Sequence, residues 1–172
     1  IQQTHDDLEA AAEKWPDDPQ IQYDLARWYL FEADRLRRTA APENRIKPLL
    51  DKAVQIVSAS LQKDPDDVQR QLNYLNILLD QQIDKREEAT QMLARLEASL
   101  VQTDMKDHIV LDAVQALATL DREPVTVNVN GVDYKTTRGI MRAEALLKQA
   151  VEKQPDEKIY LLALGRLARQ RS

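Results

Sequence analysis

The stretch EKWPDDPQIQYDLARWY, residues 13–29, decides the fold that we expect for this chain. A helical pattern stops at Pro16, because proline has no amide hydrogen and cannot continue a helix. Asp17-Asp18 follows, and such acids cap the start of a helix and face its positive end. Apolar side chains then recur at helical spacing. The stretch therefore predicts two helices joined by a tight turn.

The same turn signature occurs twice more, as Pro65-Asp66-Asp67 and Pro155-Asp156-Glu157. The first two copies lie 49 residues apart and the last two lie 90 apart, which leaves room for one degenerate unit. The paired acids are also candidates for general acid/base pairs or Ca²⁺ ligands. Capping is favoured because the acids recur at the same place in each unit. Such a repeat predicts an array of helical hairpins.

Amphipathic periodicity predicts eight helices with short connections. Their expected ranges are 4–14, 19–39, 43–63, 67–82, 85–101, 105–120, 138–153 and 157–170. The predicted fold class is all-α, an antiparallel helix-hairpin array with one small inserted β-hairpin.

Alternating valines on both sides of Asn130-Gly131 predict that β-hairpin over residues 125–135. Both turn residues must adopt positive φ, which asparagine and glycine tolerate. We expect Val129 opposite Val132, and Val127 opposite Tyr134. An isolated two-stranded hairpin is marginal in water, so we expect this one to pack on the helices or on a partner.

The composition excludes several classes of protein. The chain has 172 residues, a net charge of −5, no cysteine and only three glycines. Disulfides, thiolate catalysis and cysteine-based metal sites are excluded, and phosphate-cradling glycine loops are disfavoured. Mild acidity argues against a nucleic-acid partner, and no apolar run is long enough to insert in a membrane.

We expect one helical repeat domain over 1–172, as a fragment of a longer chain, because Ile1 rather than methionine stands first. The compartment stays open between cytoplasm and periplasm, with any signal or anchor outside this stretch.

The pattern of small and large residues resembles tetratricopeptide repeats, a family of helix–turn–helix units. The matching positions are Leu25-Ala26 and Tyr29, then Ala53, Val57 and Ser60, then Ala143, Leu147 and Ala150, then Leu164-Gly165 and Ala168, with Leu8 and Ala11 on the first helix. Two features depart from the family. The units run about 45 residues, and the third lacks its closing proline and carries the hairpin between its two helices.

The resemblance implies a scaffold or adaptor that binds a peptide or helix of another protein in a concave groove. A specialised chaperone or assembly factor for secretion or membrane complexes is the alternative. An enzyme is disfavoured, and we expect no cofactor. The residues implied to line the groove are Tyr23, Arg27 and Phe31, then Asn73, Asn76 and Asp80, then Arg166.

Some members of that family hold a chaperone's C-terminal carboxylate with lysines, asparagines and an arginine. Here only Asn73 matches that clamp, because Tyr23 stands in place of a lysine and Arg27 in place of an asparagine. The resemblance therefore disfavours that class of partner.

Other candidate groups have simpler interpretations. His108, with Asp104 and Asp107 nearby, is conceivable as a weak surface metal site, but solvated side chains at a helix start are favoured, and we expect no metal. The basic cluster of Arg35, Arg37 and Arg38 is a candidate contact for acidic lipid or RNA, but a solvated helix end is favoured. The last helix, 157–170, is apolar on more than one face. We expect it to contact further repeats or a second copy of the chain.

Overall fold

The computed structural model describes residues 2–83, 85–102 and 107–169. The chain forms two compact units, Ile1–Ala89 and Thr90–Ser172. The fifth helix begins in the first unit and continues in the second. The extent of the folding domain therefore stays a prediction.

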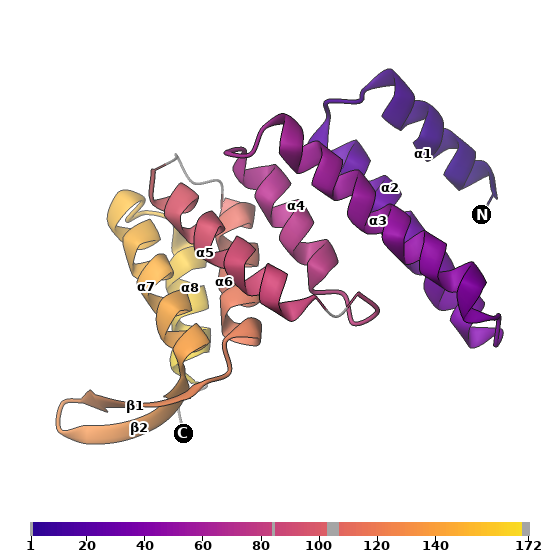
Figure 1. Ribbon diagram of the computed structural model, residues 1–172. Coiled ribbons are helices and arrows are strands. Elements are labelled where there is room, and N and C mark those ends of the chain that lie inside the picture. The colour runs from indigo at the N-terminus through magenta and orange to yellow at the C-terminus, as the bar shows by residue number, and fades with distance from the viewer. Residues whose placement is uncertain (1, 84, 103–106, 170–172) are drawn as a thin grey trace. The chain divides into compact units, whose positions relative to one another are not determined.

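Eight helices and one two-stranded sheet make up the described residues (Figure 1). In chain order they are α1 (Gln2–Lys14), α2 (Pro19–Arg38), α3 (Glu43–Lys63), α4 (Val68–Leu78), α5 (Arg86–Gln102), α6 (Asp107–Leu120), β1 (Pro124–Val129), β2 (Val132–Thr137), α7 (Arg138–Lys153) and α8 (Lys158–Ala168). The structure thus has the predicted fold class, with the hairpin inserted between α6 and α7.

The first unit is built on α2. Helices α1 and α3 both pack on α2, and α4 packs on α2 and α3. The small residues Ala26 and Ala53 are fully buried, and large side chains such as Leu25 and Val57 fill the space beside them. Burial of this amphipathic face, rather than helix propensity, stabilises helices of this length.

The second acid of each turn signature caps the helix that follows, as predicted. Asp18 accepts hydrogen bonds from the backbone N–H groups of Gln20 (2.8 Å) and Ile21 (3.1 Å). Asp67 accepts one at 2.8 Å from Arg70 N–H, and Glu157 caps α8 in the same way. Each cap satisfies amide groups that have no partner inside the helix.

Helix α4 is shorter than the predicted 67–82, because it ends at Leu78. The Asp80 side chain accepts a hydrogen bond from the backbone N–H of Gln82 at 2.9 Å. Aspartate competes in this way with the helical backbone and favours turns. The apolar residues beyond the helix therefore lie in a turn.

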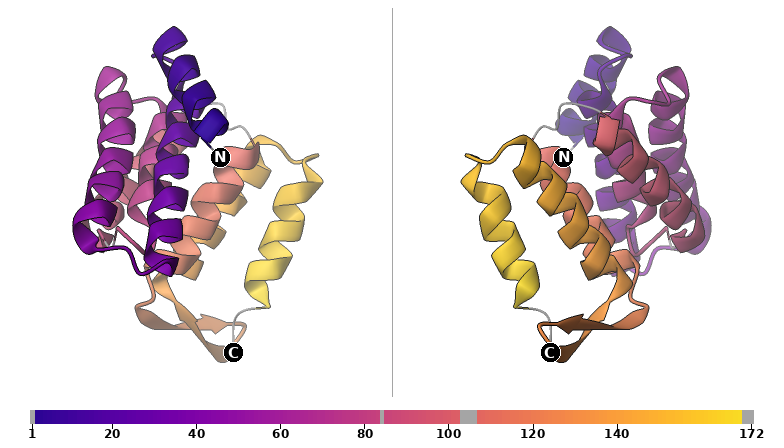
Figure 2. Two further views of the ribbon diagram at one scale, coloured as in Figure 1. Left: turned by 90° about the vertical axis from the view of Figure 1, so that its right-hand side faces the viewer. Right: turned by 90° about the vertical axis from the view of Figure 1, so that its left-hand side faces the viewer.

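The second unit is built on α7, which packs on both α6 and α8 (Figure 2). Near its start, Gly139 lies against the backbone at the end of α6. A Cβ atom there would lie 2.1 Å from the carbonyl oxygen of Leu117. Arg142 forms ion pairs with Glu97 on α5 and with Asp121 beyond α6. A close backbone approach and an ion-pair network thus fix the α6–α7 packing.

The hairpin has the predicted register, with Val129 opposite Val132 and Val127 opposite Tyr134. Asn130 and Gly131 at the tip have φ of 54° and 85°. Within its unit the hairpin extends past the ends of α6 and α7 (Figure 1). Along β1 the valines are half-buried and the residues between them are exposed. Strand β2 leads directly into α7. The hairpin is thereby anchored at its base.

Candidate functional site

Three of the predicted groove residues form one stripe along α2. Tyr23, Arg27 and Phe31 follow each other at intervals of four residues, which places them on one face of the helix. The Arg27 guanidinium lies over the Tyr23 ring, 5.8 Å from its centroid. Phe31 is 55% exposed, which is unusual for a large apolar side chain. The stripe offers a cation and an aromatic ring to solvent.

Helix α4 runs beside α2 and continues this surface. The Asn73 amide donates to the carbonyl of Pro19 near the start of α2 (2.9 Å), and the Gln82 amide donates to that of Leu30 further along (3.3 Å). The two helices are therefore parallel neighbours. When the chain is aligned on Pro16 and Pro65, Asn76 on α4 occupies the position of Arg27. Asp80, in the turn after α4, occupies the position of Phe31.

Some polar side chains of this surface form hydrogen bonds within the chain, and others do not. Asn73 is buried, and its amide oxygen accepts from Gln69 while its nitrogen donates to Pro19. Asn73 therefore positions α4 against α2. The side chains of Arg27 and Asn76 have no hydrogen-bond partner among the described residues, so their donors are available to a ligand.

Arg166, the remaining predicted residue, belongs to the second unit. It is exposed on α8, at the position that Arg27 occupies on α2 when the chain is aligned on the prolines of the signatures. The first-unit residues thus lie on the neighbouring helices α2 and α4 and in the turn after α4, whereas Arg166 lies on α8 in the second unit.

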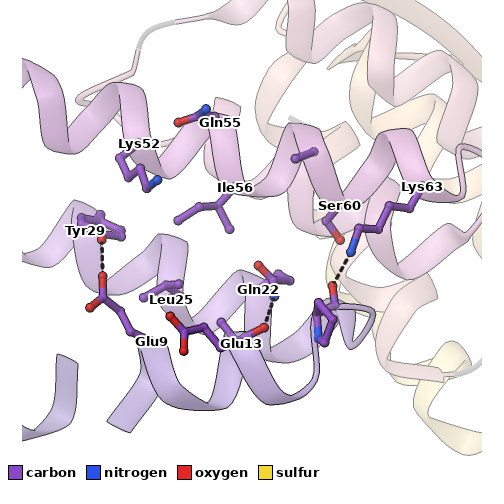
Figure 3. A pocket seen from close by; sticks show the side chains of 13 residues that line it. Glu9, Glu13, Gln22, Leu25, Tyr29, Lys52, Gln55, Ile56, Ser60 and Lys63 are labelled. Atoms are coloured by element: carbon purple, nitrogen blue, oxygen red, sulfur yellow. Dashed lines mark hydrogen bonds between the residues drawn. The ribbon is translucent and has the colours of Figure 1, made fainter. Parts of the chain in front are cut away.

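A recess that sequence reasoning missed lies between α1 and α3, above α2 (Figure 3). Its volume is about 440 Å³, and Leu25 and Ile56 are among its apolar lining residues. One end is closed by Lys63, whose ammonium donates to the carbonyl of Pro16 (2.7 Å) and to Asp17 (2.9 Å). This ion pair lowers the pKa of Asp17.

Opposite charges line the two walls of this recess. Glu13 stands on α1 and Lys52 on α3. Within the described part of the chain neither side chain has a hydrogen-bond or ion-pair partner. The recess therefore combines an apolar lining with one free carboxylate and one free ammonium group.

An aromatic cluster holds α1 on α2. The His5 ring stacks on Trp28 with centroids 4.0 Å apart, and the Tyr29 hydroxyl donates to Glu9 at 3.1 Å. Burial, and then this bond to Glu9, raises the pKa of Tyr29. Ligand atoms of His5, Asp6 and Glu9 lie within 4.8 Å of one another. However, Asp6 approaches Nδ1 and Glu9 approaches Nε2, so the ring bridges the two acids instead of sharing one ion with them.

A second buried tyrosine pairs with an acid in the first unit. The Tyr74 hydroxyl donates to the Glu88 carboxylate. Burial, and then this bond, raises the pKa of Tyr74, whereas the same bond lowers the pKa of Glu88. The pair joins α4 to the start of α5.

Two further groups were candidates from the sequence, the histidine–aspartate group near residue 108 and the basic cluster at 35–38. The side chains of Asp107 and His108, together with residue Asp104, lie outside what the structure describes. In the basic cluster, Arg35 pairs with Glu32 and Arg38 with Asp34. Those arginines are therefore engaged with acids of their own helix.

No family model matches the chain, and no curated protein matches it either. Among solved structures the chain is similar to a thermophilic TPR protein from Thermus thermophilus. The two share 15% identity with a TM-score of 0.48, over 94% of this chain and 87% of that one. No described helix is both long and apolar enough to cross a membrane. The fold assignment rests on the chain's own helices and hairpin register.

Proposed function

We propose that this chain is a protein–protein interaction scaffold that binds a peptide or helix of a partner protein across α2 and α4. One observation carries the proposal, namely that the side-chain donors of Arg27 and Asn76 have no partner among the described residues while Phe31, one turn after Arg27, is 55% exposed. The few residues that dominate binding energy in protein interfaces are enriched in arginine, tyrosine and tryptophan. Free donors on rigid helices suit the carbonyl or carboxylate groups of an extended segment.

Each residue has a distinct role in this proposal. Phe31 and Tyr23 contact apolar side chains of the partner, and Arg27, held over the Tyr23 ring, binds an acidic or carbonyl group. Asn76 binds the partner's backbone. Asn73 and Asp80 fix α4 and its following turn, and Arg166 provides an equivalent cation on α8.

Site-specific photocrosslinking tests this proposal. A photoreactive phenylalanine analogue replaces Phe31 in one variant and the exposed Met141 on α7 in a control. We expect one protein from the source lysate to crosslink at position 31 and not at position 141. A peptide from the crosslinked segment should then bind the purified chain, and the double variant Arg27→Ala/Asn76→Ala should weaken binding by about tenfold or more without loss of stability. Unchanged affinity would contradict the proposed site.

The same experiment separates the scaffold from the chaperone or assembly-factor alternative. A scaffold crosslinks to a defined segment of a folded partner. A chaperone crosslinks at position 31 to several unfolded clients, and a folded form of those clients does not compete.

A further inference from the structure

The outer face of α8 is uncovered. Leu161, Gly165 and Ala168 form a stripe on this helix, and all three are exposed, Leu161 by 51%. Aligning the chain on the signature prolines gives the equivalent stripe on α4, which is Gln71, Leu75 and Leu78, exposed by 0%, 0% and 1%. The stripe that is buried on α4 is therefore exposed to solvent on α8.

Helix α1 also has a stripe that is less buried than the equivalent stripes of other helices. Thr4, Leu8 and Ala11 form its stripe, and none of these residues is buried. The equivalent residues are fully or almost fully buried in α3 and α7. They are Ala53 (0%), Val57 (2%) and Ser60 (6%) in α3, and Ala143 (0%), Leu147 (0%) and Ala150 (1%) in α7. Helix α1 thus has the residue pattern of a second hairpin helix, but in the described chain Thr4 is exposed and Leu8 and Ala11 are only half-buried.

Helices α1 and α8 carry opposite charges, and α8 has a small residue at a position that is small and buried on α2. The residue equivalent to Gly165 is Ala26, which is fully buried on α2, the helix that packs on α3. Small residues at this point let helix backbones approach closely. Helix α1 carries four acids against one lysine, whereas α8 carries Lys158 and Arg166 and no acid between its ends. Opposite charge favours contact between α1 and α8 and disfavours pairing of α1 with itself.

We propose that α8 of one copy of this chain packs against α1 of a second copy, so that the two helices complete a hairpin like that of α2 and α3. The contact is heterologous, because each copy contributes a different surface. It leaves one α1 and one α8 open at the ends of every dimer, so further copies can add. This association is independent of the proposed function, because Arg27 and Phe31 do not take part in it.

The first test is sedimentation velocity over two orders of magnitude of protein concentration. We expect the wild-type chain to form species larger than a dimer as concentration rises. Leu161→Glu should reduce the association constant by about tenfold or more, since it places a carboxylate in the contact. Met141→Glu changes another exposed apolar residue of the same unit and should associate like the wild type. A wild-type chain that stays monomeric at every concentration would overturn the proposal.

A complementation experiment tests which surfaces meet. Leu161→Glu disables α8 but keeps α1 intact, and Thr4→Arg disables α1 but keeps α8 intact. Both residues are exposed in the single chain, so both variants should fold, which circular dichroism checks. Each variant alone should be monomeric, and an equimolar mixture should form a dimer and stop there. A mixture that remains monomeric, or variants that associate as strongly as the wild type, would refute the α1–α8 contact.

Discussion

Gly139→Ala tests the close approach of α7 to the end of α6. The new Cβ would lie 2.1 Å from the Leu117 carbonyl oxygen and 2.8 Å from that of Asp121. Both are backbone atoms, and a carbon–oxygen contact normally needs about 3.3 Å, so the helices must separate by about 1 Å. The Gly139 N–H also donates to the Asp121 carbonyl at 2.9 Å, and this bond lengthens with the shift.

The expected loss of stability follows from these contacts. Overpacking of this kind costs about 1–3 kcal/mol, and weakening the hydrogen bond costs up to about 1 kcal/mol. Alanine gains back about 1 kcal/mol because it favours helix more than glycine does. The net change is about 2 kcal/mol of lost unfolding free energy. This corresponds to a midpoint lower by about 4–8 °C if the whole chain unfolds as one domain, and by about 8–16 °C if the second unit unfolds alone.

Urea and thermal denaturation followed by far-ultraviolet circular dichroism measure this change. Gly165→Ala is the matched control, because no atom lies within 4 Å of its added Cβ. At low protein concentration that variant should be slightly more stable than the wild type. If Gly139→Ala were as stable as the wild type, the close backbone approach would be wrong.

Three other changes test contacts described above. Tyr74→Phe should reduce the acid sensitivity of the first unit. The pKa of Glu88 is lowered in the folded chain, so its stabilisation is present above the usual value of about 4.3 and is lost as pH falls through the folded pKa; an unchanged midpoint-versus-pH curve would argue against this pair. Arg70→Ala should cost about 2–4 kcal/mol in urea denaturation, because the buried guanidinium donates to Ser60 and to the Asp17 carbonyl; a cost below about 0.5 kcal/mol would show that these bonds are dispensable. Asn130→Ala should cost about 1 kcal/mol of hairpin stability, because φ is 54° there, and should increase amide exchange of β1 and β2 seen by NMR; unchanged exchange would contradict the turn geometry.

Local chemistry made most of the fold predictable. A proline followed by two acids ends one helix and caps the next, whatever surrounds it. Asn130-Gly131 likewise fixes the turn, and the turn fixes the pairing of every residue along both strands. The end of α4 was less predictable, because Leu79 and Ile83 continue an apolar pattern that the Asp80 turn interrupts.

The candidate site was predictable only where it depends on helix phase. Aligned signatures placed Arg27 and Asn76 at equivalent positions, but helix phase alone could not show that Asn73 is buried against α2. The recess was missed because it requires α1 and α3 to rest on the same helix. The separation between Glu13 and Lys52 along the chain carries no periodic signal of that arrangement.

The division of the chain into two units gives the first unit an optical signal of its own. Both tryptophans, Trp15 and Trp28, lie in the first unit, and Trp28 is stacked on His5. Indole emission during denaturation therefore follows the first unit alone, whereas the amide signal follows helices of both. Coincident emission and amide transitions would identify one cooperative folding domain over 1–172, and separated transitions would identify two.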